Sequence, residues 1–188
     1  MAGAGISALI ARSGGGDDDL DPPPNEIPAP VPGLPFVAHG PGIAVAVTQV
    51  RAYSTGLEIS VEVRFNAQDT PAEALVELNR LMRDVRDPGP ERLHLALRRT
   101  DGAGAQNNRP EGPHQSAPAA SPMLIQDASS RGPAWRLAYW ARLRPDSGAA
   151  LSVQWPAQGV QSATVDLAAA DVTQAAARIQ RLWPPQEP

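Results

Sequence analysis

The chain has 188 residues and a formal net charge of −4 at pH 7, which suits one folded domain with tails. The acidic balance argues against a broad basic surface of the kind that binds nucleic acid or anionic lipid. No cysteine occurs, which excludes disulfides, thiolate metal sites and a cysteine nucleophile. All the cationic residues apart from histidine are arginine, and together with the many alanines, glycines and prolines this is typical of a GC-rich genome.

The first part of the chain has the composition of an arm. Residues 1–38 are rich in glycine, aspartate and proline, and include the run DPPPNEIPAPVPGLP. Repeated prolines remove backbone donors and favour extended conformations over a packed core. We therefore predict a disordered, proline-rich arm over 1–38, a folded domain over 39–184 and a short tail over 185–188.

The opening residues carry a short apolar run with no basic residue before it. A secretory signal peptide has a basic start and a longer apolar middle, so this segment does not predict export. No stretch of about 18 apolar residues occurs, so no membrane span is expected. A cytoplasmic location follows as the prediction.

Alternating apolar residues predict an antiparallel hairpin over 43–65. The apolar parity changes after Val47, which indicates a β-bulge or a twist in the first strand. Ser54-Thr55-Gly56 supplies the turn. The second strand, LEISVEVRF over 57–65, alternates strictly, which predicts one buried and one solvent-exposed face. The outward residues would be Glu58, Ser60, Glu62 and Arg64.

Two segments have helical rather than strand periodicity. Thr70-Pro71-Ala72-Glu73 is a capping box that predicts a helix over 70–86, ended by a Pro/Gly cluster. Asp171 and Gln174 have the same spacing, and apolar residues at intervals of three and four then continue to Trp183. A second, C-terminal helix is therefore predicted, ended by Pro184-Pro185.

The remaining runs predict further strands and a loop. Leu93, Leu95 and Leu97 point inward in one strand, and 101–122 reads as a long polar, mobile loop. Shorter strands are expected at 123–126, 135–144, 151–155 and 163–167. The pattern predicts a mainly β domain: an antiparallel β-sandwich, immunoglobulin-like, with one inserted and one C-terminal helix.

The strand WRLAYWARLR over 135–144 contains the candidate functional residues. Trp140 falls on the opposite parity to Trp135 and Tyr139, so it should face away from the core. The candidate interaction patch consists of Arg136, Trp140, Arg142 and Arg144. Tryptophan and arginine are enriched in interfaces, which supports an exposed recognition patch.

Structural packing is the favoured alternative for Trp140. If this strand lies beside LEISVEVRF, Glu58 and Glu62 can pair with its arginines across the sheet. Arginine stems would then cover the indole ring. The C-terminal helix, whose apolar face needs a sheet to lie on, could cover it as well.

Catalytic and metal-binding patterns are not recognisable. His39, His94 and His114 lack the i+2 or i+4 partner that a metal site or a ligand-and-base pair uses. Glu58 and Glu62 lie about 13 Å apart along one strand, too far for the paired carboxylates of a glycosidase. We expect no catalytic residue of a known motif, no metal and no cofactor.

Several short motifs are shared with a known family. Thr48 with Ala52-Tyr53-Ser54-Thr55-Gly56, Tyr139-Trp140, Trp155-Pro156-Ala157-Gln158-Gly159 and Leu182-Trp183-Pro184 resemble a family of uncharacterised actinobacterial proteins. The resemblance covers 42–66 and 121–184. It implies a compact β-rich domain and carries no known activity or site residues. The helix at 70–86 and the loop at 101–122 exceed the family's usual connections.

The functional prediction is a non-enzymatic protein-interaction or scaffold module whose partner is another protein, with the oligomeric state open. It rests on the absence of catalytic motifs, the proline-rich arm and the Trp/Arg face. Two alternatives stay open. One is a hydrolase whose site is assembled from residues distant in sequence, and the other is an envelope-associated domain.

Overall fold

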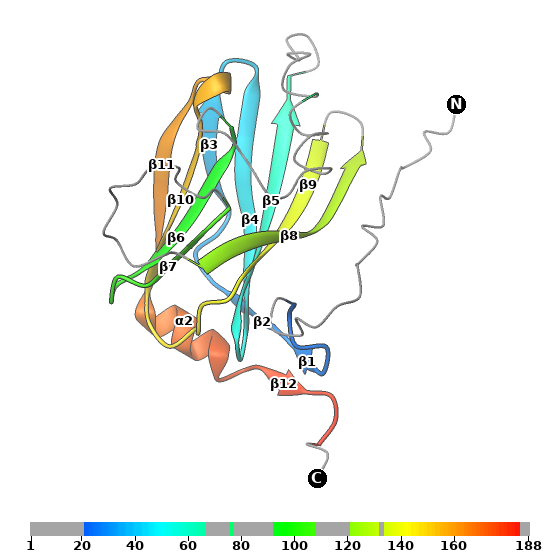
Figure 1. The fold of residues 1–188 in the computed structure, drawn as a ribbon, viewed down its shortest axis with the longest axis vertical. Coiled ribbons are helices and arrows are strands. Elements are labelled where there is room, and N and C mark those ends of the chain that lie inside the picture. Colours follow the sequence, from blue (N-terminus) through cyan, green and yellow to red (C-terminus); the bar gives the residue numbers. More distant parts are fainter. Residues whose placement is uncertain (1–20, 67–75, 77–91, 108–120, 132–133, 185–188) are drawn as a thin grey trace.

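The protein is mainly β (Figure 1). The computed structural model describes residues 21–66, 76, 92–107, 121–131 and 134–184. The strands are β1 (Glu26–Ile27), β2 (Ala29–Val31), β3 (Phe36–Gly40), β4 (Ile43–Tyr53), β5 (Gly56–Phe65), β6 (His94–Arg99), β7 (Gly104–Gln106), β8 (Ser121–Arg131), β9 (Ala134–Ala141), β10 (Ala149–Trp155), β11 (Val160–Leu167) and β12 (Gln180–Arg181). A short 3-10 helix η2 (Pro156–Gln158) and the α-helix α2 (Ala169–Ala176) complete the described elements.

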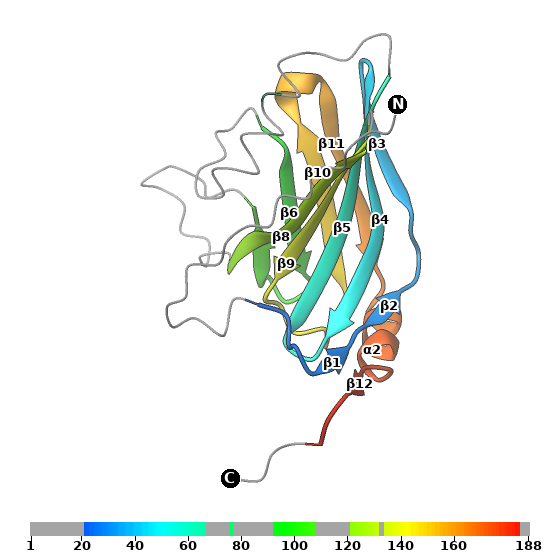
Figure 2. The same cartoon turned by 90° about the vertical axis from the view of Figure 1, so that its right-hand side faces the viewer.

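Ten strands form one hydrogen-bonded sheet: nine follow the order β11-β10-β6-β7-β8-β9-β5-β4-β2, and the tenth, β3, pairs with β4. They form two antiparallel groups, one built around β4, β5, β9 and β8 and the other around β6, β10 and β11 (Figures 1 and 2). A short parallel pairing of β7 with the start of β8 joins the groups. Apolar residues of both groups form one hydrophobic core.

The two ends of this strand order come back together. β11 stands at one end and β3 pairs at the other, yet the two strands lie against each other. Gly40 makes this approach possible, because a Cβ atom there would lie 2.4 Å from the carbonyl oxygen of Gln158. The missing side chain lets β3 pass close to η2 and the start of β11, and so the strands wrap around a single interior.

The hairpin prediction is confirmed, including its irregularity. β4 and β5 pair antiparallel from Ile43–Phe65 to Tyr53–Gly56, and the register shifts between Val47 and Gln49. Thr48 is the extra residue, and its hydroxyl donates to the carbonyl oxygen of Ser60 at 3.3 Å. The shift restores the inward orientation of Val50, which is fully buried. The bulge thus lets the apolar residues before and after Thr48, which have opposite parities in the sequence, point into the same core.

The prediction that the outward face of β5 is exposed to solvent is wrong for its two glutamates. Glu58 and Glu62 are only 8% and 7% exposed. β5 is a central strand with β4 on one side and β9 on the other, so long side chains from both neighbours lie over it. Arginines among those neighbours pair with the carboxylates and offset the cost of burying them.

Part of the segment predicted as a disordered arm belongs to the sheet. Residues 1–20 lie outside the described residues, but β1, β2 and the start of β3 fall within 21–38. Ala29 and Val31 are buried, and β2 pairs with β4 along one edge. Pro30 fits this position because an edge strand leaves one side of its backbone unpaired. The proline-rich composition predicted an extended arm, but it did not indicate that the two residues on either side of Pro30 are buried.

The C-terminal helix is present, but its limits differ from the prediction. α2 covers Ala169–Ala176, begins after Ala168 without a side-chain cap, and buries Val172 and Ala175. The predicted Asp171 capping box is therefore wrong, since Asp171 lies inside the first turn. After the helix the chain extends into β12, which pairs with β1. The predicted helix at 70–86 lies almost wholly outside the described residues.

The loop prediction over 101–122 is wrong at both ends. β7 forms inside it and pairs with β6, and β8 begins at Ser121 and continues to Arg131, well beyond the predicted 123–126. Residues 108–120 lie outside the described residues. The strands predicted at 93–97, 151–155 and 163–167 are present, and their inward leucines at 93, 95, 97, 151 and 167 are buried.

The mainly β prediction is thus confirmed, whereas the immunoglobulin-like sandwich stays a prediction. Among the described residues no helix has both the length and the apolar character needed to cross a membrane.

Candidate functional site

Trp140, the central residue of the predicted patch, is buried. It lies on the opposite face of β9 from Trp135 and Tyr139, as its parity predicted, yet only 1% of it is exposed. Its ring meets that of Tyr53 edge to face, with centroids 5.4 Å apart and planes at 87°. It is not part of the main core cluster. Trp140 therefore packs on a second, smaller buried layer on the outer face of the sheet.

Gly56 completes this layer at the start of β5. A Cβ atom on Gly56 would lie 2.6 Å from two carbons of the Trp140 ring and 2.5 Å from the carbonyl oxygen of Ala141. The indole thus occupies the space that a side chain at position 56 would need. Packing is the interpretation of Trp140 that the structure supports.

Glu58 is a buried carboxylate beside this aromatic pair. It is directly opposite Trp140 on β9 and Arg51 on β4. Arg51 donates to one carboxylate oxygen, and the Tyr53 hydroxyl donates to the other at 3.2 Å. Burial and the neighbouring Glu58 charge raise the pKa of Tyr53 above its ordinary value, so the phenol stays protonated and remains a donor.

Glu62 forms the second ion-paired carboxylate of the same face. Arg64, two residues along the strand, donates to one oxygen, and Arg136 from β9 donates to the other at 3.3 Å. The predicted pairing of Glu62 with an arginine of the 135–144 strand is confirmed for Arg136, its cross-strand neighbour. Burial alone would raise the pKa of Glu62, but the two arginines outweigh it and hold the pKa below its ordinary value.

This arrangement predicts a specific loss of stability in acid. A group with a lowered folded-state pKa contributes stability above its unfolded pKa and loses it as the pH falls through the folded value. Glu62→Gln is therefore expected to lower the urea midpoint at pH 7, and the difference from the unmodified protein should shrink once the pH falls below 4.5, the ordinary pKa. A difference that stays constant down to acid pH would contradict the assignment to Glu62.

The structure places the predicted patch residues in different surroundings. Arg136 is exposed and paired with Glu62, Arg142 is exposed just after β9, and Trp140 is buried. Arg144 lies farther along the chain and lines a pocket. These four residues do not form one exposed surface, because the strand ends at Ala141 and burial of Trp140 separates Arg136 from the later arginines.

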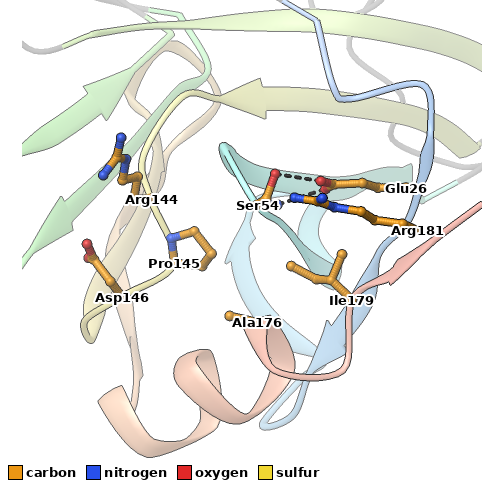
Figure 3. Close-up of a pocket in the computed structure, with 8 residues that line it drawn as sticks. All are labelled: Glu26, Ser54, Arg144, Pro145, Asp146, Ala176, Ile179 and Arg181. Carbon is orange, nitrogen blue, oxygen red and sulfur yellow. Dashed lines mark hydrogen bonds between the residues drawn. The ribbon is translucent and has the colours of Figure 1, made fainter. Parts of the chain in front are cut away.

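The pocket that Arg144 lines has a volume of about 430 Å³ and is open to solvent (Figure 3). Segments from four distant parts of the sequence form its walls: β1, the β4–β5 turn, the chain after β9, and the stretch from α2 to β12. The lining residues are Glu26, Ser54, Arg144, Pro145, Asp146, Ala176, Ile179 and Arg181.

Both carboxylates of the lining already have partners. Glu26 accepts hydrogen bonds from the Ser54 backbone N–H at 2.9 Å and from its hydroxyl at 2.6 Å (Figure 3). Asp146 pairs with Arg99 at 2.8 Å. Arg99 also donates to the carbonyl oxygen of Arg144 at 3.2 Å, so one arginine holds both ends of the 144–146 segment in place.

The two arginines of the lining differ from the carboxylates. Neither the Arg144 nor the Arg181 guanidinium forms a hydrogen bond or an ion pair with the described part of the chain. Each guanidinium carries five N–H donors. The polar groups that the pocket leaves available are therefore mainly donors with positive charge.

β1 and β12 form a two-stranded ribbon at the rim of this pocket, which we call the terminal ribbon (residues 25–27 and 180–183). Glu26 is opposite Arg181 and Ile27 is opposite Gln180, and the Leu182 N–H donates to the Asn25 carbonyl oxygen at 2.8 Å. Because side chains alternate along a strand, Glu26 and Arg181 face the pocket and Ile27 and Leu182 face away.

The terminal ribbon carries three exposed apolar side chains. Ile27 is 47% exposed, Leu182 is 42% exposed, and the next residue, Trp183, is 66% exposed. The other three tryptophans are at most 8% exposed. A tryptophan that is 66% exposed, on the same short ribbon as two exposed aliphatic side chains, marks a candidate contact site.

Sequence reasoning missed the terminal ribbon and most of the pocket. Two-residue strands carry no periodic signal, and the apolar residues 179, 182 and 183 also fit a helical period. β1 pairs with a segment more than 150 residues away along the chain. The available signal was the isolated Leu182-Trp183 pair before two prolines, which the predicted helix absorbed.

Comparison with protein-family models, with curated proteins and with solved structures finds no match to this chain. The resemblance to the actinobacterial family therefore stays a prediction. Function must be inferred from the geometry of the site itself.

Proposed function

We propose that the protein is a non-enzymatic protein-interaction module, built on an immunoglobulin-like β-sandwich, and that it binds its partner through the terminal ribbon and the adjoining pocket. The observation that carries the proposal is the exposure of three apolar residues on the terminal ribbon, Ile27, Leu182 and Trp183. Exposed tryptophan contributes strongly to protein interfaces because it buries a large area on contact. A cytoplasmic location and a protein partner remain part of this proposal.

The backbone pairing of the terminal ribbon supports an interaction role. The terminal ribbon is held by backbone pairing between β1 and β12 and by the two hydrogen bonds from Ser54 to Glu26. A surface that is already ordered before binding loses less conformational entropy when it binds. The predicted patch around Trp140 is replaced as the proposed contact surface, since its tryptophan is buried, and only Arg144 carries over.

A hydrolase would have to draw on Ser54, whose hydroxyl is the one candidate nucleophile among the described lining residues. Glu26 accepts that hydroxyl hydrogen bond at 2.6 Å but also holds the Ser54 backbone N–H. The described lining contains no histidine to transfer a proton to a leaving group. A binding role uses the groups that the pocket presents, and we therefore prefer it.

Selection of a displayed random-peptide library on the full chain tests the proposal. Peptides should be enriched, and their affinity should fall about tenfold or more for Leu182→Ser and Trp183→Ser, because hot-spot truncations commonly cost about 2 kcal/mol or more. Val37→Ser is the matched control, since Val37 is 42% exposed on β3, outside the terminal ribbon. No enrichment, or equal affinity for all three variants, would contradict the proposal.

A further inference from the structure

The pocket beneath the terminal ribbon offers an unusual combination of charge and apolar surface. Its carboxylates are occupied, Glu26 by Ser54 and Asp146 by Arg99. The guanidiniums of Arg144 and Arg181 have no partner among the described residues. A ligand that enters therefore meets donors that need an acceptor, and a carboxylate is the protein group that satisfies a guanidinium best.

The two arginines come from separate elements and stand on opposite sides of the pocket. Arg144 belongs to the segment after β9, and Arg181 belongs to β12, with its side chain directed across the pocket toward Ser54 (Figure 3). Arg99 fixes the backbone on the Arg144 side, and pairing with β1 fixes the backbone on the Arg181 side. The backbone positions of the two arginines are thus set by the fold.

Apolar atoms lie between and beside these charges. Pro145 is buried, Ile179 is partly buried, and Ala176 at the end of α2 completes this part of the lining. Leu182 and Trp183 add exposed apolar side chains outside the pocket, at the end of the same ribbon. A ligand that matches both parts carries an acidic group next to a large apolar group.

We propose that the pocket binds an acidic peptide segment of the partner, with one carboxylate at Arg181, another at Arg144, and a neighbouring apolar side chain against Ile179 and Pro145. This inference rests on the proposed interaction function and names the chemistry of the partner. An anionic membrane is the rejected alternative, because such surfaces are bound by clusters of about four to eight basic residues, whereas the described lining of the pocket holds two arginines.

Three labelled peptides test the proposal by fluorescence polarisation on the full chain. One carries Asp-Glu-Leu-Phe, the second replaces the acids to give Asn-Gln-Leu-Phe, and the third keeps the acids but replaces the apolar pair to give Asp-Glu-Ser-Ser. The first is expected to bind about tenfold or more tightly than each of the others, since loss of a charge-assisted hydrogen bond commonly costs that much. Its affinity should fall with added salt.

Charge-removing variants locate the contact. Arg144→Gln and Arg181→Gln should each weaken binding of the acidic peptide about tenfold and leave the amide peptide unchanged. Arg98→Gln is the matched control, because Arg98 is an exposed arginine of β6 and does not line the pocket. It should have no effect. Circular dichroism of each variant verifies that the fold is retained.

The outcomes separate this inference from the proposed function. Equal binding of the acidic and amide peptides, an equal loss with Arg98→Gln, or binding only to vesicles of phosphatidylglycerol and phosphatidylcholine would overturn the acidic-peptide inference. If library peptides still depend on Leu182 and Trp183 while Arg144→Gln and Arg181→Gln do nothing, the interaction module stands and only the assigned ligand chemistry is wrong.

Discussion

Replacing Trp140 with alanine is expected to lower the free energy of unfolding by about 3–5 kcal/mol, the usual cost of emptying a large buried aromatic site. The indole is 1% exposed, meets Tyr53 edge to face and fills the space beside Gly56. Alanine would leave a cavity beside Tyr53 and Gly56, whose backbone is held by the pairing of β4 with β5. Tyr53 would also lose its aromatic neighbour.

Urea unfolding, followed by far-UV circular dichroism, measures this loss. Trp183→Ala is the matched control, because it removes the same side chain at a site that is 66% exposed and should change stability by no more than about 0.5 kcal/mol. The two variants should rank in the opposite order in peptide binding, which Trp183→Ala should weaken more than Trp140→Ala. Similar unfolding free energies for both variants would contradict the packing role of Trp140.

Substituting Gly56 with alanine is expected to destabilise the fold by about 1–3 kcal/mol, the range for overpacking a filled interior. Gly56 does not adopt a positive φ, so backbone conformation is not the reason. The new Cβ atom would lie 2.5 Å from the Ala141 carbonyl oxygen and 2.6 Å from the Trp140 ring. The ring can shift, but the carbonyl belongs to the neighbouring strand β9 and cannot move without disturbing its pairing.

A double-mutant cycle with Trp140→Phe separates these two contacts. The smaller ring relieves the contact with the new methyl group, so the double variant should lose less stability than the sum of the single losses. The loss of stability that Gly56→Ala still causes in the Trp140→Phe background measures the contact with the Ala141 carbonyl oxygen. Losses that simply add would show that Gly56 and Trp140 do not compete for the same space.

Trp140, which broke the alternation of the 135–144 strand, has a structural role. The prediction that it faces away from the core was correct, but an exposed position was not, because a side chain on the outer face of a sheet can still be covered by its neighbours. Glu58 and Glu62 repeat this outcome. Both lie on the predicted outward face, and both are buried under side chains from β4 and β9.

Local pattern was sufficient for the long alternating strands and for the irregularity in β4. The strict alternation over 57–65 follows from the two-residue repeat of a strand, and the change of parity after Val47 indicated a bulge or a twist, of which the structure shows the bulge. These features depend on neighbours a few residues apart, so the sequence by itself determined them. The mainly β class followed from the number of such runs.

Only the tertiary structure decided the site. The pocket joins Glu26, Ser54, Arg144 and Arg181, which are far apart in the chain and belong to elements that meet only after the sheet has closed. β1 and β12 are too short to carry a periodic signal, and each becomes a strand because the other lies beside it. Pairing over such distances depends on the free energy of the whole fold rather than on local preference. No local pattern could therefore have placed Arg144 and Arg181 in the lining of one pocket.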